Sequence, residues 1–211
     1  MHHGHLKHLH LIKGSDIMNK LNGLRCYLAG PIDHAEDDGI GWRREIGEWL
    51  RNKGVVVMDP TDKPTSQTKF KEIEEEKTKL IELKRLGRWA ELRGYMKEIV
   101  LADLRMVEIS DFNIVYIDTD VHLCGTYEEL FVSLRQRKPT FVVAKNGKES
   151  LSVWLFGRMN PDFIFDSFET MLDYLNGIDV GLIEPDTTRW VFFDHMVGNS
   201  QKIQIETTGE E

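Results

Sequence analysis

Two adjacent carboxylates stand where a strand-like run gives way to a helix. The stretch "HLCGTYEELFVSL" places Glu128 and Glu129 shortly after Gly125 and Thr126. A carboxylate at this point can attack an electron-poor carbon or stabilise a positive charge, and the helix dipole would favour its ionised form by about 0.3–1 kcal/mol. Neighbours on a helix point about 100° apart, so only one of the two acids can face a given ligand. The alternative is that both acids only complement the helix dipole.

The two residues ahead of these acids could shape the same site. Gly125 allows a tight turn and the close approach of a ligand to the backbone. Thr126 is a suitable N-cap for the helix that follows, and that capping role alone could account for it.

Other polar residues follow the first two strand-like runs. The segment "AGPID" places Gly30, Pro31 and Asp33 after the first run, where backbone N–H groups and a small residue suit a base or a phosphate. A Gly-Pro pair at a strand end is also typical of a plain turn. Asp59 closes the second run. Asp103 lies in the helical segment "LADLRMVE", where an aspartate considered alone is expected to face water.

Arginines near the same loop could bind an anion. Arg43 and Arg44 open the helix after the Gly-Pro loop, and with Arg105 they could clamp a phosphate through charge-assisted hydrogen bonds. The alternative for all three is a solvated helix face.

The elements that must position these residues alternate along the chain. Apolar runs predict buried strands at 24–30, 55–60, 111–118 and 140–145, and "DFIFDSFETMLDYLNG" predicts one more short strand and a helix. Helical spacing predicts a helix over 40–54 that stops at Gly54. The charged stretch 69–110 contains Gly87 and Gly94 and predicts at least two helices: a mostly solvated one to about Arg85, and one from about Trp89 to Ile109 that packs on the sheet.

Strands that alternate with helices predict an α/β fold. We expect a flavodoxin/Rossmann-like, largely parallel sheet with helices on both faces, a helical insertion and a C-terminal hairpin from "TRWVFFD" and "QKIQIET". Ligands of such sheets bind beyond the carboxyl ends of the strands. Residues 30–33, 59–60 and 118–129 should therefore share one edge of the sheet.

Length and composition limit the class of protein. The 211 residues suit one domain, and the net charge of -8 disfavours a general nucleic-acid-binding surface. The two cysteines have no CxxC spacing, and no apolar run is long enough for a transmembrane helix. We expect a cytoplasmic protein with no membrane partner.

The chain divides into three parts. Residues 1–17 hold five of the eight histidines and are interpreted as an expression tag, with a metal-binding tract as the alternative. Residues 18–180 should form the functional domain, with the helical insertion at about 64–92, and 181–211 a C-terminal extension.

The motifs considered together resemble one family. "YLAGPID", "GWRREIGEWL", "VVVMDP", "IVLADLRMVEISDFNIVYID", "CGTYEELFVSL" and "KPTFVV" occur in an order and spacing similar to the nucleoside 2-deoxyribosyltransferase family. The nearest resemblance is to the branch with a Gly-Pro-Ile-Asp loop and a Gly-Thr-Tyr-Glu-Glu-Leu helix start. It covers about 24–175 and is weaker over 63–92.

The resemblance implies roles for particular residues. The family's nucleophile is a glutamate four positions after the loop glycine, which is Glu129 here. Its catalytic aspartate lies 26 positions before that glutamate, which is Asp103. Tyr27 and the loop 30–33 match its first strand and its base- and sugar-binding loop. Many members carry an aspartate or serine just ahead of the glycine; here Asp120, His122 and Cys124 are open candidates for that role.

The resemblance also implies an activity. The enzyme would cleave the N-glycosidic bond of 2′-deoxyribonucleosides or their 5′-monophosphates through a glycosyl-enzyme ester on Glu129, and transfer deoxyribose to another base or to water. No metal or redox cofactor is required, and the partner is a small nucleoside or nucleotide. Members complete their pockets across subunits, so a homo-oligomer is expected, with "SVWLFG" and "TRWVFFD" as possible contacts.

Two other functions stay open. One is a nucleoside-monophosphate phosphoribohydrolase, whose Pro-Gly-Gly-x-Gly-Thr-x-x-Glu motif is echoed by "CGTYEE" without its Pro-Gly-Gly start. The other is a non-catalytic nucleotide-binding sensor, because the same fold serves many functions. A sensor would not need Glu129 and Asp103 together.

Overall fold

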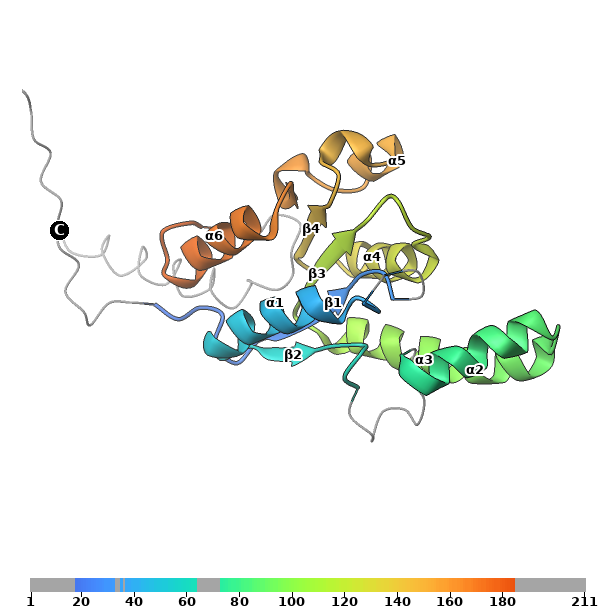
Figure 1. The fold of residues 1–211 in the computed structure, drawn as a ribbon. Helices are drawn as coiled ribbons and strands as arrows, with labels where there is room; N and C mark the ends of the chain where they lie inside the picture. The colour runs from blue at the N-terminus through green and yellow to red at the C-terminus, as the bar shows by residue number, and fades with distance from the viewer. Residues whose placement is uncertain (1–17, 33–34, 36, 64–72, 185–211) are drawn as a thin grey trace, which may run out of the picture.

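A five-stranded parallel sheet forms the centre of the part of the chain that the structure describes (Figure 1). The computed structural model describes residues 18–32, 35, 37–63 and 73–184. The strand order β2-β1-β3-β4-β5 with every pair parallel is the flavodoxin-like arrangement, so the predicted fold class is confirmed. The strands are β1 (Arg25–Ala29), β2 (Val56–Met58), β3 (Phe112–Ile117), β4 (Thr140–Ala144) and β5 (Ile164–Phe165).

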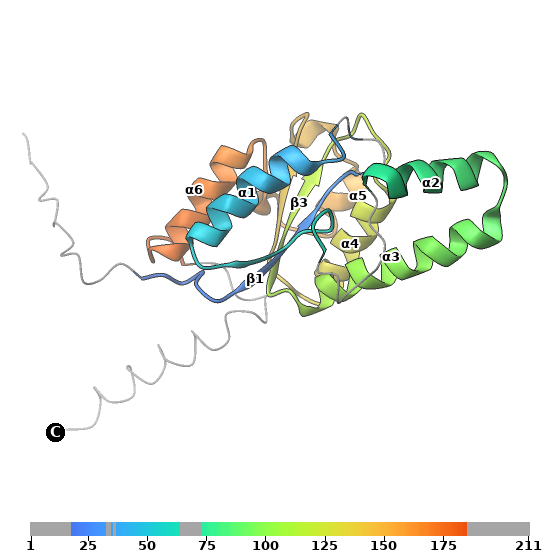
Figure 2. The same cartoon turned by 60° about the horizontal axis from the view of Figure 1, so that its bottom comes forward.

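Helices cover both faces of the sheet, as Figures 1 and 2 show. α1 (Ile40–Asn52) and α6 (Phe168–Asp179) lie on one face. α3 (Trp89–Ile109) and α4 (Cys124–Arg135) lie on the other. The short helix α5 (Val153–Phe156) and two single 3₁₀ turns precede β5.

Strand alternation divides the core into two layers. Cys26 and Leu28 of β1 face the α1/α6 layer, whereas Tyr27 and Ala29 face the α3/α4 layer. Successive side chains of a strand point to opposite faces of the sheet. The register of β1 therefore determines which of its residues face each helix layer. Tyr27 therefore lies, fully buried, beneath the two helices that carry the predicted catalytic acids.

The charged stretch forms a helical hairpin that projects from the sheet (Figure 2). α2 (Glu74–Arg85) and α3 meet at Gly87, whose φ of 67° suits glycine. The predicted pair of helices is confirmed, although α3 continues through Gly94. Only the C-terminal half of α3 is buried against the domain, through Ile99, Ala102, Asp103, Met106 and Val107.

Three predictions concern the N-terminal end, the C-terminal end and the segment "SVWLFG", which includes α5 and was expected to contact a second subunit. The interpreted tag at 1–17 and the predicted hairpin at 188–207 lie outside the described residues. In α5, Leu155 is buried, whereas Val153 and Trp154 are largely exposed.

A buried polar network fixes α4 against the sheet. Asn113 of β3 donates from Nδ2 to Ser133 Oγ of α4 at 2.5 Å and accepts from Ser110 Oγ at 2.9 Å. Ser133 also hydrogen-bonds with Thr140 Oγ1 of β4 at 2.7 Å. Because a buried polar group is costly when unpaired, this network favours one position of α4 over the strands. It thereby sets where α4 presents Glu129.

We expect Asn113→Ala to lower the free energy of unfolding by about 1–3 kcal/mol, since two buried hydroxyls, those of Ser110 and Ser133, each lose one of their hydrogen bonds. Urea denaturation measures this loss. Asn146→Ala is the matched control: it removes an exposed bond to Thr119, and we expect a change within about 0.5 kcal/mol. Equal losses in both variants would contradict the account of the network.

Candidate active site

The predicted site residues gather at the carboxyl ends of the strands. β1 and β3 are neighbours in the sheet. The chain passes from β1 to β2 on one side of this pair, and from β3 to β4 on the other side. Such a switch point is where flavodoxin-like sheets bind ligands. Tyr27 in the middle of β1 contacts Glu129 of α4. Arg43 of α1, Asp59 and Lys63 after β2, and Asp103 of α3 interact beside this pair.

A hydrogen bond joins β1 to α4 at the centre of the site. The phenol of Tyr27 donates to Glu129 Oε1 at 2.5 Å. Burial, with Glu129 and Asp103 as smaller contributions, raises the pKa of Tyr27 well above its usual range. The phenol therefore stays protonated and acts as the donor to a carboxylate, which makes the bond charge-assisted. Glu129 is half-buried, whereas Glu128 is exposed.

The helix dipole does not account for these acids. α4 begins at Cys124 with Leu123 as its N-cap, and no acid occupies its first turn. The dipole's effect falls off within that turn, so its predicted role at Glu129 is wrong, and Tyr27 holds the carboxylate instead. The predicted N-cap at Thr126 is also wrong: this residue lies inside the helix and its side chain is buried.

Gly125 leaves open space at the start of α4. Its φ is not positive, so the predicted tight turn does not occur there. A Cβ added at Gly125 would meet no atom within 4 Å. The glycine therefore matters to the fold only a little, and the space in front of it is compatible with close approach of a ligand.

Asp103 is buried on α3 and faces the sheet, not the solvent. The expectation from the helix segment alone, that it faces water, is wrong, because its exposed fraction is 7%. Burial raises the pKa of Asp103, and Lys63 and Arg43 oppose that rise. Asp103 also acts electrostatically on Tyr27. Besides burial, the charges of Glu129 and Asp103 thus both raise the pKa of the Tyr27 phenol that lies between β1 and the two helices.

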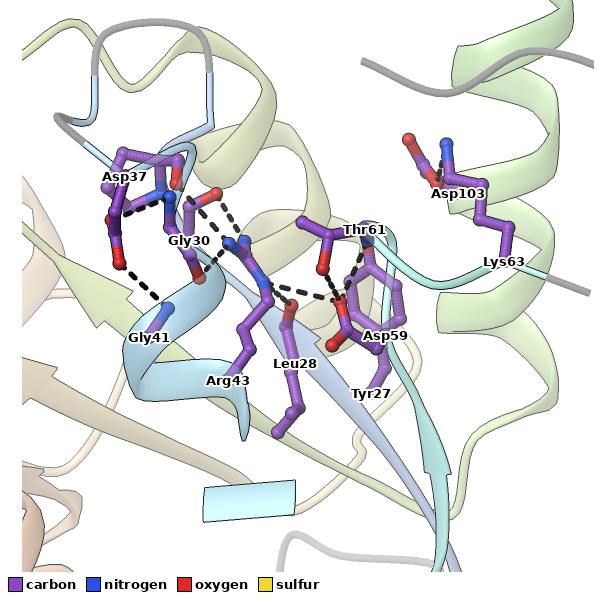
Figure 3. A network of polar contacts seen from close by, with 12 residues as sticks. Tyr27, Leu28, Gly30, Asp37, Gly41, Arg43, Asp59, Thr61, Lys63 and Asp103 are labelled. Carbon is purple, nitrogen blue, oxygen red and sulfur yellow. Dashed lines mark hydrogen bonds and ion pairs between the residues drawn. The ribbon is translucent and has the colours of Figure 1, made fainter. Parts of the chain in front are cut away.

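Arg43 lies beneath the Gly-Pro loop with its guanidinium fully buried (Figure 3). It donates to four backbone carbonyls and lies 3.8 Å from Asp59 Oδ1. The accepting carbonyls are those of Leu28 at 3.2 Å, Gly30 at 2.7 Å, Pro31 at 3.4 Å and Gly39 at 2.9 Å.

This arrangement corrects the predicted role of Arg43. Since backbone carbonyls occupy its donors, Arg43 shapes the loop and is not the predicted substrate clamp. Arg44 and Arg105 are exposed, and Arg105 pairs with Glu108 on its own helix. The solvated-face alternative holds for these two arginines.

The other predicted loop residues also have structural partners. A Cβ on Gly30 would lie 2.8 Å from the Trp42 ring, so tight packing requires glycine there. Asp59 Oδ1 accepts from the backbone and hydroxyl of Thr61 at 2.8 and 2.7 Å, which closes the turn after β2. Asp33 lies outside the described residues. The structure thus gives no ligand-facing role to Gly30 or Asp59.

The helical hairpin reaches the same loop. Lys77 Nζ of α2 donates to the carbonyl of Ile32 at 3.3 Å and pairs with Asp38. Asp38 has a φ of 55°, unusual for a residue other than glycine. The Gly-Pro loop is therefore held by Arg43 from below and by Lys77 from the hairpin.

The loop after β3 leaves its open candidates exposed. Asp120, His122 and Cys124 are all solvent-accessible. Asp118 pairs with Lys145 at 2.8 Å, and Asp120 lies 3.5 Å from the same amine. The structure does not single out one of the three for sugar or phosphate binding.

Within the described residues, no group of three or more His, Cys, Asp or Glu side chains is placed to hold a metal ion. None of the helices there is both long and apolar enough to span a membrane.

Comparisons with known proteins complete the description of the site. No protein-family model matches the chain, and no curated protein does. Among solved structures, the fold is similar to a 2-desoxiribosyltransferase from Leishmania mexicana, with 20% sequence identity and a TM-score of 0.44. The match covers 72% of this chain and 97% of that one.

Sequence reasoning missed Lys63 and misjudged Arg43. Arg43 lies three, four and seven positions before Ile46, Gly47 and Leu50, all buried. That spacing marks the buried stripe of a helix and could have placed Arg43 inside. Lys63 follows β2 in an irregular segment, where no periodicity reports burial.

We expect Arg43→Met to lower the free energy of unfolding by about 3 kcal/mol or more, because several buried carbonyls lose their donor. Denaturant unfolding measures the loss. Arg44→Met, at the exposed neighbour, should change stability by no more than about 0.5 kcal/mol. A stable Arg43→Met variant that gains no other donor would contradict the role of Arg43 in shaping the loop.

Proposed function

We propose that the protein cleaves the N-glycosidic bond of 2′-deoxyribonucleosides, with Glu129 as nucleophile, and passes the sugar to another base or to water. The observation that carries this proposal is the half-buried Glu129 carboxylate, held by the Tyr27 phenol at the switch point of the sheet. A second carboxyl, that of the buried Asp103, also acts on the Tyr27 phenol, where burial and the charges of both acids raise the pKa.

The first chemical step takes place at C1′ of the sugar. The bond between C1′ and the base nitrogen breaks with its electron pair remaining on the base, and a Glu129 oxygen forms a bond to C1′ from the opposite face. The Tyr27 hydrogen bond limits rotation of the carboxylate, so the attacking oxygen is positioned before the substrate binds. The resulting ester is released when a second base or water attacks the same carbon.

Asp103 is the proposed acid for the leaving base. Its raised pKa favours a protonated carboxyl nearer neutral pH, as a general acid requires. The proton passes from the Asp103 carboxyl to a ring nitrogen as the glycosidic bond breaks. The leaving base then departs as a neutral molecule.

The geometry favours free nucleosides over their 5′-monophosphates. Of the three arginines expected to clamp a phosphate, Arg43 has its donors occupied by carbonyls, and Arg105 pairs with Glu108. Deoxynucleosides, their monophosphates and the matching ribonucleotides, each incubated with and without an acceptor base and analysed by chromatography, test this preference. Cleavage of ribonucleotides alone would favour the phosphoribohydrolase alternative, and binding without cleavage would favour the sensor.

We expect Glu129→Ala to abolish base release, because loss of a covalent nucleophile costs several orders of magnitude in rate. Glu128→Ala is the matched control: the adjacent acid is exposed and should leave the rate near that of the wild type. Chromatography of base release from deoxynucleosides measures both variants. An inactive Glu128→Ala beside an active Glu129→Ala would overturn the assignment.

We expect Asp103→Asn to slow cleavage of ordinary deoxynucleosides by about 100-fold or more, the usual contribution of a general acid. A deoxyriboside with an activated leaving group needs no proton and should be slowed far less. The rate on the ordinary substrate divided by the rate on the activated one, compared between wild type and variant, measures the loss of proton donation separately from any loss of binding. Equal slowing on both substrates would exclude Asp103 as the acid.

A further inference from the structure

Lys63 is a buried lysine whose ammonium contacts a proposed catalytic acid. Its exposed fraction is 3%, and its Nζ lies 2.7 Å from Asp103 Oδ1 (Figure 3). Lysine is rarely buried unless it is paired. The two atoms form an ion pair, and within the described residues neither atom has a further hydrogen-bond partner.

The charged and titratable groups near Asp103 come from four segments besides its own helix. Lys63 follows β2, Arg43 lies on α1, Tyr27 on β1, and Glu129 on α4 beside the Tyr27 phenol. Burial raises the pKa of Asp103, Lys63 opposes it most, and Arg43 opposes it less. Since Arg43 is committed to backbone carbonyls, Lys63 is the cation free to respond to the charge of Asp103.

We infer that Lys63 is a positioning residue that holds the Asp103 carboxyl group and controls whether it carries a proton. The catalytic part of this inference rests on the proposed function; the control of protonation does not. When Asp103 donates to the leaving base, its O–H bond breaks and an N–H bond forms on the base. The carboxylate left behind stays beside the Lys63 ammonium, which stabilises it.

A substitution series separates charge from packing. Lys63→Met removes the ammonium and keeps much of the side-chain volume, whereas Lys63→Arg keeps the positive charge. Lys84→Met is the control, because Lys84 is an exposed lysine on α2. The carboxyl titration of Asp103, followed by carbon-13 NMR and assigned with Asp103→Asn, is the direct measurement and needs no enzymatic activity.

We expect Lys63→Met to move the titration midpoint of Asp103 upward by about 1 pH unit or more, since a nearby opposite charge lowers a carboxyl pKa by about 1–3. Lys63→Arg and Lys84→Met should leave the midpoint near that of the wild type. An unchanged midpoint in Lys63→Met would overturn the inference.

Thermal unfolding gives a second measurement if the variant folds poorly. A carboxyl whose folded pKa is raised contributes stability at low pH that is lost as pH rises towards the folded value. The melting temperature of Lys63→Met should therefore fall below that of the wild type by a gap that widens from about pH 4 to neutral pH. The control compares Lys63→Met/Asp103→Asn with Asp103→Asn alone, where no Asp103 carboxyl titrates. Between these two variants the gap should not depend on pH, and a pH-dependent gap would contradict the pairing.

The pH dependence of base release links the pair to catalysis. In the pH–rate profile, the fall in rate that follows deprotonation of Asp103 should occur at higher pH in Lys63→Met. In Lys63→Arg it should occur near the pH found for the wild type. An NMR shift in a protein that cleaves no nucleoside would leave the control of protonation intact and refute the proposed function. A kinetic limb that stays in place while the NMR midpoint moves would refute the catalytic role of Lys63 alone.

Discussion

The hydrogen bond between Tyr27 and Glu129 joins residues 102 positions apart, and the candidate site depends on it. The bond exists because β1 and β3 are neighbours in a parallel sheet and because Tyr27 faces the α3/α4 layer. A register shift of one residue in β1 would turn Tyr27 towards α1 and α6 and leave Glu129 without this donor. The buried residues on both sides of β1 exclude such a shift, so core packing and site geometry are set together.

Much of the fold could be predicted from the sequence, because strand and helix periodicities are local signals. Residue types alone predict the apolar runs that form β1, β3 and β4. They also predict that α1 and α2 end near Gly54 and Gly87. The common edge of the site followed from the parallel topology. The choice of Glu129 over Glu128 came from a resemblance, and the structure adds that Glu129 is the one that Tyr27 contacts.

The partners of the polar residues could not be predicted in the same way. Whether Arg43 faces a phosphate or four carbonyls depends on the path of a loop that precedes it. Asp103 lies on a helix rich in apolar residues, and only tertiary packing shows that it is buried with Lys63. Because α4 begins as early as Cys124, Glu128 and Glu129 lie beyond its first turn, where the helix dipole has little effect on them. Each of these outcomes depends on contacts between distant segments.

The two buried cations have separate tasks at this edge. Arg43 stabilises backbone and fixes the shape of the Gly-Pro loop, whereas Lys63 contacts a side chain that can change its charge. Together they offset the local negative charge of Asp59, Asp103 and Glu129 in a protein whose net charge is -8. This local balance allows an acidic chain to bury carboxyl groups where the proposed chemistry needs them.

Direct capture of the covalent intermediate tests the central claim. The enzyme would be mixed with a deoxynucleoside in the absence of an acceptor base, quenched rapidly in acid, digested and examined by mass spectrometry. We expect a deoxyribosyl ester on the peptide that contains Glu129, with fragmentation placing the sugar on that residue. Turnover without any covalent sugar, or with the sugar on a different residue, would contradict it.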